Sequence, residues 1–317
     1  MIKKILMAGA FTACAVSAQA QVSYFGYGTI GYNEFSEEYI AGEIGIAYGD
    51  YSLTLGNTSA ATSLVDTFDG MVYEFYDQRA SRYREPIVVR ADATFGASHI
   101  AISYETELND EGNDGLAVGF STSFSGIDFS AGYQDNGIFV GCCGTENTGS
   151  VYGASVGFDL YGVDTTIAYI FGDHANFNES YESLGVNMAY AFNQIMVEGY
   201  VVAGNSQDNN PIPHFDDISY GVSASYDYGS GEVRGFFASE NKEDPQNLGV
   251  DVSYTGFSSI ALYAGYSDPY GAYAGVVYDG LGNGIELGLS YSEYDAVAAL
   301  DGNYFFDGAS VWLTAEF

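Results

Sequence analysis

The sequence predicts an all-β protein, a closed antiparallel transmembrane β-barrel of 16–18 strands. Three observations predict this fold. Apolar and small polar residues alternate with period two along most of the chain, short and long connections alternate between these segments, and no stretch of about 20 consecutive apolar residues occurs. The 41 Gly, 29 Tyr and 21 Phe, with only 5 Pro, suit strands that have one apolar and one wet face.

The first 20 residues predict an export signal. Lys3 and Lys4 give a positive start, residues 5–16 are mostly apolar, and the stretch "SAQA" supplies small residues before a cut after Ala20. The apolar stretch is too short to span a bilayer as a helix. We therefore expect residues 1–20 to be removed and residues 21–317 to form one barrel domain.

The alternation is clearest in residues 284–294, "GIELGLSYSEY", where apolar residues occupy every second position. The same period recurs in residues 116–124, 152–160 and 183–192. The second face holds Gly, Ser, Ala, Asn, Thr and acids with scarcely a Lys, whereas the outer face of a soluble sandwich normally carries mixed charges. We therefore expect the apolar face to meet lipid and the polar face to enclose water.

The strands can be assigned in order along the chain. Tight turns alternate with long polar loops, which is typical of an outer-membrane barrel with its turns on the periplasmic side. Two weak strands could merge, which would reduce the count to 16. The 18 segments are 22–33, 40–48, 51–56, 86–94, 98–106, 115–124, 127–134, 151–160, 163–171, 182–191, 195–203, 218–227, 231–239, 248–254, 260–266, 272–278, 284–293 and 304–317.

The last segment ends in "SVWLTAEF". In a strand, Val311, Leu313, Ala315 and Phe317 lie on one face, and a terminal aromatic residue on that face is well placed if the surrounding solvent is lipid. Every backbone group inside a bilayer must be paired. We therefore expect this strand to pair with the first strand and close the barrel.

Charge and motifs exclude several functions. A net charge of −34 disfavours a nucleic-acid partner. No G-x-S-x-G motif is present, and "FGYGTIG" is a strand and not the start of a helix, so an enzyme is not expected. The adjacent pair Cys142-Cys143 favours a disulfide or free thiols over a metal site. Residues 109–114 and 216–217 offer oxygen ligands for Ca²⁺ but match no full calcium loop, so we expect no cofactor, with Ca²⁺ bridging of these acidic loops as the alternative.

The few cations are concentrated in one place. Four of the eight Lys and Arg lie within twelve residues, and residues 57–85 form the longest connection, a kind of loop that is usually functional. The alternation of residues 87–94 directs Arg90 and Asp92 inward. Simple surface pairing of these arginines is the alternative. The charged candidates are Asp66, Asp69, Glu74, Asp77, Arg79, Arg82, Arg84, Arg90 and Asp92.

Other acids also fall on the inward face. They would give the lumen a negative potential that concentrates cations and weakens as salt rises. The alternation places these acids at Glu43, Glu105, Asp128, Asp159, Asp164, Glu198, Asp251 and Glu286.

The sequence resembles the general-diffusion porins of Gram-negative outer membranes, in particular the short alphaproteobacterial type. The resemblance is carried by the "SAQA" signal end, the alternating strands, the terminal "SVWLTAEF" and the long insertion after "YSLTLGNTSAATSLVDTF". Members of that family typically have 16 strands and form trimers. Their long loop follows the fifth strand, whereas the long connection here follows the third.

The resemblance implies a cell outer-membrane channel, multi-pass and homotrimeric, that passes small hydrophilic solutes and cations in contact with lipid and lipopolysaccharide. It also implies that residues 57–85 fold into the lumen, so that loop acids face wall arginines across a constriction. The terminal pattern Val311, Leu313, Ala315 and Phe317 is similar to the signal that the barrel-assembly machinery recognises.

Three other functions remain as alternatives. A substrate-specific channel for sugars would use Tyr200, Tyr263 and Tyr278 as an inward stacking track, although these residues could equally belong to the aromatic girdles. A barrel enzyme would need a nucleophile motif. A plugged structural barrel would need large apolar residues on the inner face.

Overall fold

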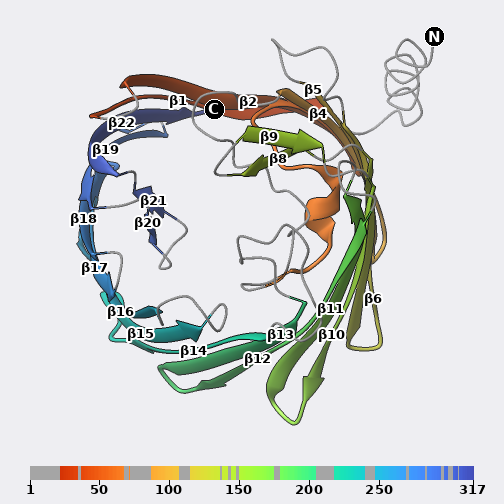
Figure 1. Ribbon diagram of the computed structural model, residues 1–317. Coiled ribbons are helices and arrows are strands. Elements are labelled where there is room, and N and C mark those ends of the chain that lie inside the picture. Colours follow the sequence, from red (N-terminus) through yellow and green to blue (C-terminus); the bar gives the residue numbers. More distant parts are fainter. Residues whose placement is uncertain are drawn as a thin grey trace.

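Eighteen strands form one closed antiparallel sheet, as Figure 1 shows in a view along the barrel. The structure is a computed structural model. It describes residues 22–34, 37–67, 71, 87–106, 115–135, 138–141, 144–147, 150–174, 179–204, 218–239, 247–268, 271–282, 284–293, 296–298, 303–305 and 307–317. The expectation of an all-β barrel is confirmed. The barrel has 18 strands, as counted from the sequence, and not the 16 that the resemblance implies.

Each of the 18 expected segments corresponds to one barrel strand. The strands are β1 (Val22–Asn33), β2 (Glu37–Tyr48), β3 (Tyr51–Gly56), β4 (Ile87–Phe95), β5 (Ser98–Thr106), β6 (Gly115–Phe124), β7 (Ile127–Asp135), β10 (Val151–Leu160), β11 (Val163–His174), β12 (Glu179–Phe192), β13 (Ile195–Ala203), β14 (Ile218–Asp227), β15 (Gly231–Ser239), β16 (Asn247–Phe257), β17 (Ile260–Asp268), β18 (Gly271–Tyr278), β19 (Ile285–Ser292) and β22 (Gly308–Glu316).

Among the described residues, five short elements lie outside the barrel sheet. They are the single helical turn η1 (Ala61–Leu64) and two small hairpins, β8 (Ile138–Gly141) with β9 (Gly144–Asn147) and β20 (Ala296–Ala298) with β21 (Asn303–Phe305). The expected last strand began at residue 304, which is wrong, because residues 303–305 pair within the β20–β21 hairpin. Gly308, with φ of +80°, then bends the chain into β22.

Tight turns join the strands at one end of the barrel. Phe124 pairs with Ile127, so only two residues make the turn between β6 and β7. Ser125 and Gly126 both have positive φ, 56° and 79°, which matches the right-handed twist of a two-residue hairpin. Residues 161–162 form a turn of the same kind between β10 and β11.

The last strand pairs with both β19 and β1, and the pairing with β1 closes the cylinder. This confirms the expected pairing of the first and last strands. In the register with β1, Thr314 lies opposite Thr29, and their hydroxyls hydrogen bond at 2.8 Å.

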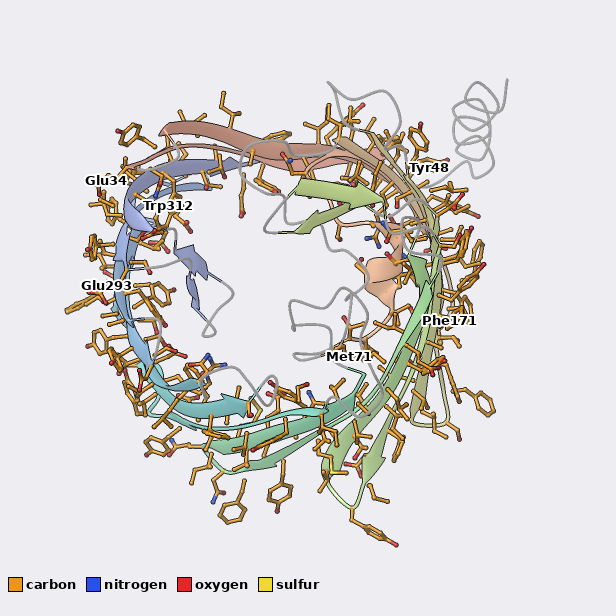
Figure 2. All side chains as sticks on the ribbon, viewed as in Figure 1. Glu34, Tyr48, Met71, Phe171, Glu293 and Trp312 are labelled. Atoms are coloured by element: carbon orange, nitrogen blue, oxygen red, sulfur yellow. The ribbon has the colours of Figure 1, made fainter. Side chains whose placement is uncertain are left out.

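The expected division of the two faces is also present. Large apolar side chains surround the outside of the barrel, and Ile40, for example, is 79% exposed. Figure 2 shows Phe171 on the outer side and Met71 on the inner side. The inner positions hold mostly Ser, Thr, Gly and acids, including Ser130, Ser155 and Asp251. Among the described residues, no helix is long and apolar enough to cross a membrane.

Candidate functional site

The connection after β3 folds back against the inner wall of the barrel, where Figure 1 shows η1 in orange. Two hydrogen bonds fasten its helical turn to neighbouring strands. The amide of Ala61 donates to Ser103 Oγ of β5 at 2.8 Å, and Thr62 Oγ1 donates to Gln134 Oε1 of β7 at 3.3 Å. The described part of this connection, residues 57–67, is called the inner segment below.

Asp66 fastens the next part of the inner segment to β10. Its amide donates to Ser155 Oγ at 3.3 Å, and Ser155 Oγ donates to the Asp66 carboxylate at 3.3 Å. Ser130 of β7 also hydrogen bonds to Ser155, at 2.5 Å. Asp66 therefore lies on the inner wall and positions the loop, in addition to contributing a negative charge there.

Two wall glycines make room for the inner segment. Gly119 of β6 and Gly132 of β7 are cross-strand partners. A Cβ atom at Gly119 would overlap the carbonyl oxygen of Ala61, and one at Gly132 would lie 2.9 Å from Val65 Cγ2. At Gly119 the loop backbone therefore rests directly on the strand backbone, an approach that only glycine permits, whereas at Gly132 the missing side chain leaves space for the side chain of Val65.

A small apolar cluster holds the part of the connection that follows η1. Val65 and Met71 pack against Val151, Ile170 and Val202, which project inward from β10, β11 and β13. Ile170 and Val202 are each 0% exposed. The expectation that the inner face lacks large apolar residues is wrong at these positions, because the loop covers them and they never meet water.

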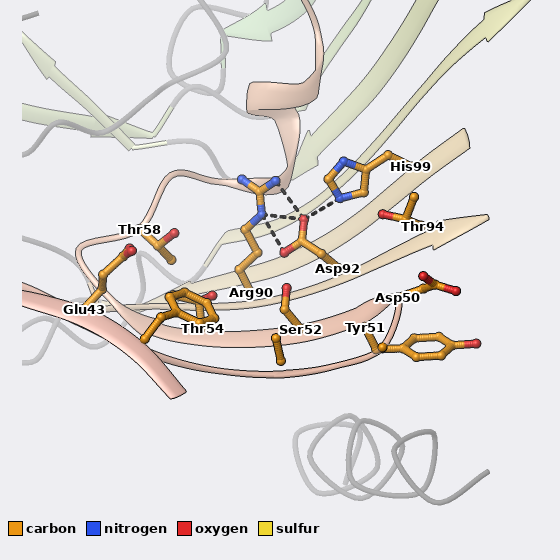
Figure 3. Close-up of a pocket in the computed structure, with 13 residues that line it drawn as sticks. Glu43, Asp50, Tyr51, Ser52, Thr54, Thr58, Arg90, Asp92, Thr94 and His99 are labelled. Carbon is orange, nitrogen blue, oxygen red and sulfur yellow. Dashed lines mark hydrogen bonds and ion pairs between the residues drawn. The ribbon is translucent and has the colours of Figure 1, made fainter. Parts of the chain in front are cut away.

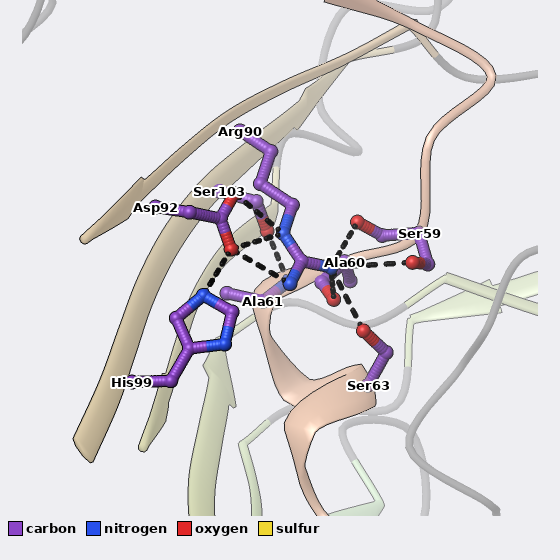
Figure 4. Close-up of polar contacts among 8 residues, drawn as sticks. All are labelled: Ser59, Ala60, Ala61, Ser63, Arg90, Asp92, His99 and Ser103. Atoms are coloured by element: carbon purple, nitrogen blue, oxygen red, sulfur yellow. Dashed lines mark hydrogen bonds and ion pairs between the residues drawn. The ribbon is translucent and has the colours of Figure 1, made fainter. Parts of the chain in front are cut away.

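Arg90 of β4 joins the inner segment to the wall. As Figure 4 shows, its Nη1 donates to the carbonyl of Ser59 at 3.2 Å, to the carbonyl of Ala60 at 3.1 Å and to Ser63 Oγ at 2.8 Å. Arg90 is only 9% exposed. It points inward as the alternation predicted, yet its guanidinium is directed into the loop backbone and is largely shielded from the lumen.

Asp92 neutralises this arginine. Its carboxylate accepts hydrogen bonds from Arg90 Nε at 3.0 Å and from Arg90 Nη2 at 2.9 Å. His99 Nε2 of β5 lies 2.8 Å from the same carboxylate. The two hydrogen bonds from Nε and Nη2 to one carboxylate fix the orientation of the Arg90 guanidinium. Asp92 and His99 therefore complete the anchor that positions the inner segment.

The other arginine that the structure describes lies across the barrel, on β15. Arg234 Nη2 pairs with Asp251 Oδ2 at 2.7 Å, and Tyr273 donates its hydroxyl proton to Asp251 Oδ1 at 2.6 Å. The Arg234 guanidinium lies 5.0 Å from the centre of the Phe236 ring. In the described part of the chain, both arginines are thus paired with an aspartate.

Several wall acids have no such cation beside them. Glu198 accepts a hydrogen bond from Asn187 at 2.8 Å, Asp159 accepts one from the amide of Gly162 at 3.0 Å, and Asp128 accepts one from Ser123. The alternation with exposed apolar neighbours directs all three acids inward. Since their partners are uncharged, the described inner wall has an excess of negative charge.

A recess of about 550 Å³ lies in the wall beside the Arg90 anchor, and Figure 3 shows its lining. Side chains from β1 to β5, together with the start of the inner segment, form its walls. The lining includes Phe25, Glu43, Asp50, Ser52, Thr54, Thr58, Arg90, Asp92, Thr94 and His99.

Several predicted residues lie outside the described residues. These are Asp69, Glu74, Asp77, Arg79, Arg82 and Arg84 of the long connection, the pair Cys142-Cys143, and the acidic stretches 109–114 and 216–217. Residues 1–21 also lie outside them. Among the residues that are described, no group of three or more His, Cys, Asp or Glu could hold a metal ion.

Sequence reasoning missed the wall residues that receive the loop. Their signals were the glycines at 119 and 132 and the apolar residues Val151, Ile170 and Val202 at inward positions. A large apolar residue on the wet face of a strand indicates that another part of the chain covers it.

Comparison with known proteins bears on the fold. Neither a family model nor a curated protein sequence matches the chain. An engineered variant of the porin of Rhodopseudomonas blastica superposes with a TM-score of 0.52 at 13% identity, over 94% of this chain and 100% of that one. A triple variant of the same porin gives 0.51 at 14% identity, with the same coverage. This chain therefore has the fold of a porin barrel.

Proposed function

We propose that this chain, which has the porin fold, forms a water-filled channel in the outer membrane of a Gram-negative bacterium. It passes small hydrophilic solutes and ions by passive diffusion. The observation that carries this proposal is the closed 18-stranded sheet with apolar side chains outside and Ser, Thr, Gly and acids inside. A β-sheet satisfies all its backbone hydrogen bonds in a bilayer only when it closes on itself, and a closed sheet with a polar inner face encloses water.

The inner segment narrows this channel. Its backbone lies against β5, β6, β7 and β10, and its apolar end reaches β13, so one side of the lumen is partly filled. The resemblance implies an electric field between loop acids and wall arginines across the constriction. Arg90 adds little to such a field, because its guanidinium is ion-paired with Asp92 and hydrogen bonded to the inner segment. Arg90 sets the position of the constriction and contributes little to the field.

The channel prefers cations. Both described arginines are neutralised by aspartates, whereas Glu198, Asp159 and Asp128 retain uncompensated charge on the wall. A low-dielectric wall strengthens the field of such acids inside a narrow lumen. Salt screens that field, so the preference declines as ionic strength rises.

Purified protein reconstituted in planar bilayers tests the proposal. We expect discrete single-channel steps and, in a KCl gradient, a reversal potential of the sign that K⁺ selectivity requires. The magnitude of this potential should fall between 0.1 M and 1 M salt, since the Debye length shortens from about 10 Å to about 3 Å. An anion-selective reversal potential would overturn the selectivity, and the lack of any conductance would overturn the channel itself.

A sugar-specific channel receives less support. Tyr278 is on the outer face, because it pairs with Leu287 and Ile260 among the lipid-facing residues. Tyr263 and Tyr273 do project inward, but they are only 8% and 6% exposed. Rings so deeply buried offer little surface on which a sugar could stack.

A further inference from the structure

The recess beside the Arg90 anchor has the chemistry of a binding site. It is about 550 Å³ in volume, within the range of small-molecule sites. Figure 3 shows Glu43 at one end and Asp50 at the other, with Ser52 and Thr54 between them. Glu43 and Ala47 of β2 both line the recess and are four residue steps apart, so at about 3.3 Å per residue the recess extends roughly 13 Å along β2.

The net charge of the recess is negative. Asp92 is already paired with Arg90 and hydrogen bonded to His99, so this triad adds little charge. Glu43 and Asp50 have no hydrogen bond or ion pair from their carboxylates among the described residues. A ligand that carries an ammonium group can therefore be held at either end.

The middle of the recess is lined by hydroxyl groups. Ser52, Thr54 and Thr94 lie on the inward faces of β3 and β4, and Thr58 lies near the start of the inner segment. Thr54 is buried at the floor of the recess, whereas Ser52 and Thr58 are partly exposed and Thr94 is exposed, so these three offer their hydroxyls to a ligand. Hydroxyls both donate and accept hydrogen bonds, so a row of them matches a ligand with hydroxyls along its length.

An aromatic ring completes one wall. Phe25 folds over Gly45 of the neighbouring strand, where a Cβ atom would overlap its ring, and the ring then lines the recess near Glu43. Aromatic faces attract alkylammonium groups within about 6 Å by the cation–π interaction. The carboxylate and the ring at this end both favour an organic cation over a neutral solute.

We propose that this recess is a binding site for linear hydroxylated alkylammonium ions, which it retains on their way through the lumen. The inference deepens the proposed channel function, because it names a class of solute that the channel would favour. Anions are repelled by Glu43 and Asp50. Neutral polyols gain the hydroxyl contacts but lack the charged one, so they bind more weakly.

Isothermal titration calorimetry on the detergent-solubilised protein tests the site without relying on conductance. The probe is N-methylglucamine, and its neutral counterpart of similar length is sorbitol. We expect saturable binding of N-methylglucamine and at least about tenfold weaker binding of sorbitol. Equal binding of the two would overturn the proposal.

The double variant Glu43→Gln/Asp50→Asn removes both charged ends and should weaken N-methylglucamine binding at least about tenfold. The matched control is Glu232→Gln/Asp279→Asn, which removes one inward acid and one turn acid elsewhere on the barrel. The control should bind as the unmodified protein does. An equal loss in both variants would assign the binding to the diffuse field of the wall and refute a local site.

Planar-bilayer recordings provide a second readout. N-methylglucamine added to KCl should cause brief current blockages that the Glu43→Gln/Asp50→Asn variant shortens at least about tenfold. A protein that binds the probe in calorimetry yet conducts no ions would refute the channel and leave the site intact. A conducting protein without specific probe binding would refute only the site.

Discussion

The amide of Gly26 donates to the carbonyl of Phe317 at 3.1 Å, and the amide of Phe317 donates to the carbonyl of Gly26 at 3.0 Å. The last residue of the chain is thus a hydrogen-bonded partner of the first strand. A Cβ atom at Gly26 would lie 2.9 Å from Phe317 Cζ, so the aromatic ring covers the position where Gly26 has no side chain.

Removal of Phe317 should impair barrel closure, because both of these hydrogen bonds and the ring contact are lost. We expect less folded protein in the outer membrane, measured as the heat-modifiable band on unboiled gels. Phe124→Ala, at an exposed turn position away from the seam, is the matched control and should assemble normally. Normal assembly without Phe317 would contradict a role of Val311, Leu313, Ala315 and Phe317 as the assembly signal.

Arg90→Gln should release the inner segment. The four acceptor atoms in Ser59, Ala60 and Ser63 lose their hydrogen-bond donor, and Asp92 loses its ion-pair partner. We expect a larger and noisier single-channel conductance, with a free energy of unfolding about 1–3 kcal/mol lower. Arg234→Gln removes the same charge on the opposite wall without touching the loop. If both variants change conductance equally, Arg90 acts through its charge and not as an anchor.

Gly119→Ala should displace η1, because the new methyl group would overlap the Ala61 carbonyl. Overpacking of this kind typically costs about 1–3 kcal/mol. Gly157→Ala is the control, since a Cβ there would lie 3.6 Å from its nearest neighbour, Asp128 Cβ, in ordinary contact. Urea unfolding in detergent micelles measures both variants, and an equally stable Gly119→Ala protein would refute the close approach.

Deletion of residues 63–77 should raise single-channel conductance, because it removes Val65 and Met71 from the inner wall. The measurement is the conductance step in symmetrical KCl. An unchanged step would mean that this connection does not limit the lumen.

Val222→Arg and Ser223→Arg test the two faces at the middle of β14. Val222 is 50% exposed on the outer face, and an arginine there should destabilise the barrel in lipid by about 2–4 kcal/mol. Ser223 faces inward and pairs with Glu198, so an arginine there should be tolerated. Unfolding in lipid vesicles compares the two, and equal losses would contradict the assignment of the lipid face.

The strands and their two faces could be predicted from the sequence because period two is a local property. In residues 183–192, for example, the alternation by itself indicates that Met188 and Tyr190 face outward, and both are exposed. The inward direction of Arg90 and Asp92 followed in the same way. The turn residues, such as Ser125-Gly126, separated the strands well enough to give the count of 18.

The partners of the inward residues could not be predicted, since they depend on how the closed barrel brings distant strands together. Arg90 looked like a wall cation that faces the lumen, and only the fold shows that Ser59 and Ser63 surround its guanidinium. Likewise, the inward apolar residues Val151 and Val202 are explained only by the fold, in which Val65 and Met71 pack against them. Local periodicity determines which side of the wall each side chain occupies, whereas tertiary closure decides which segments, separated by up to about 140 residues, share that side.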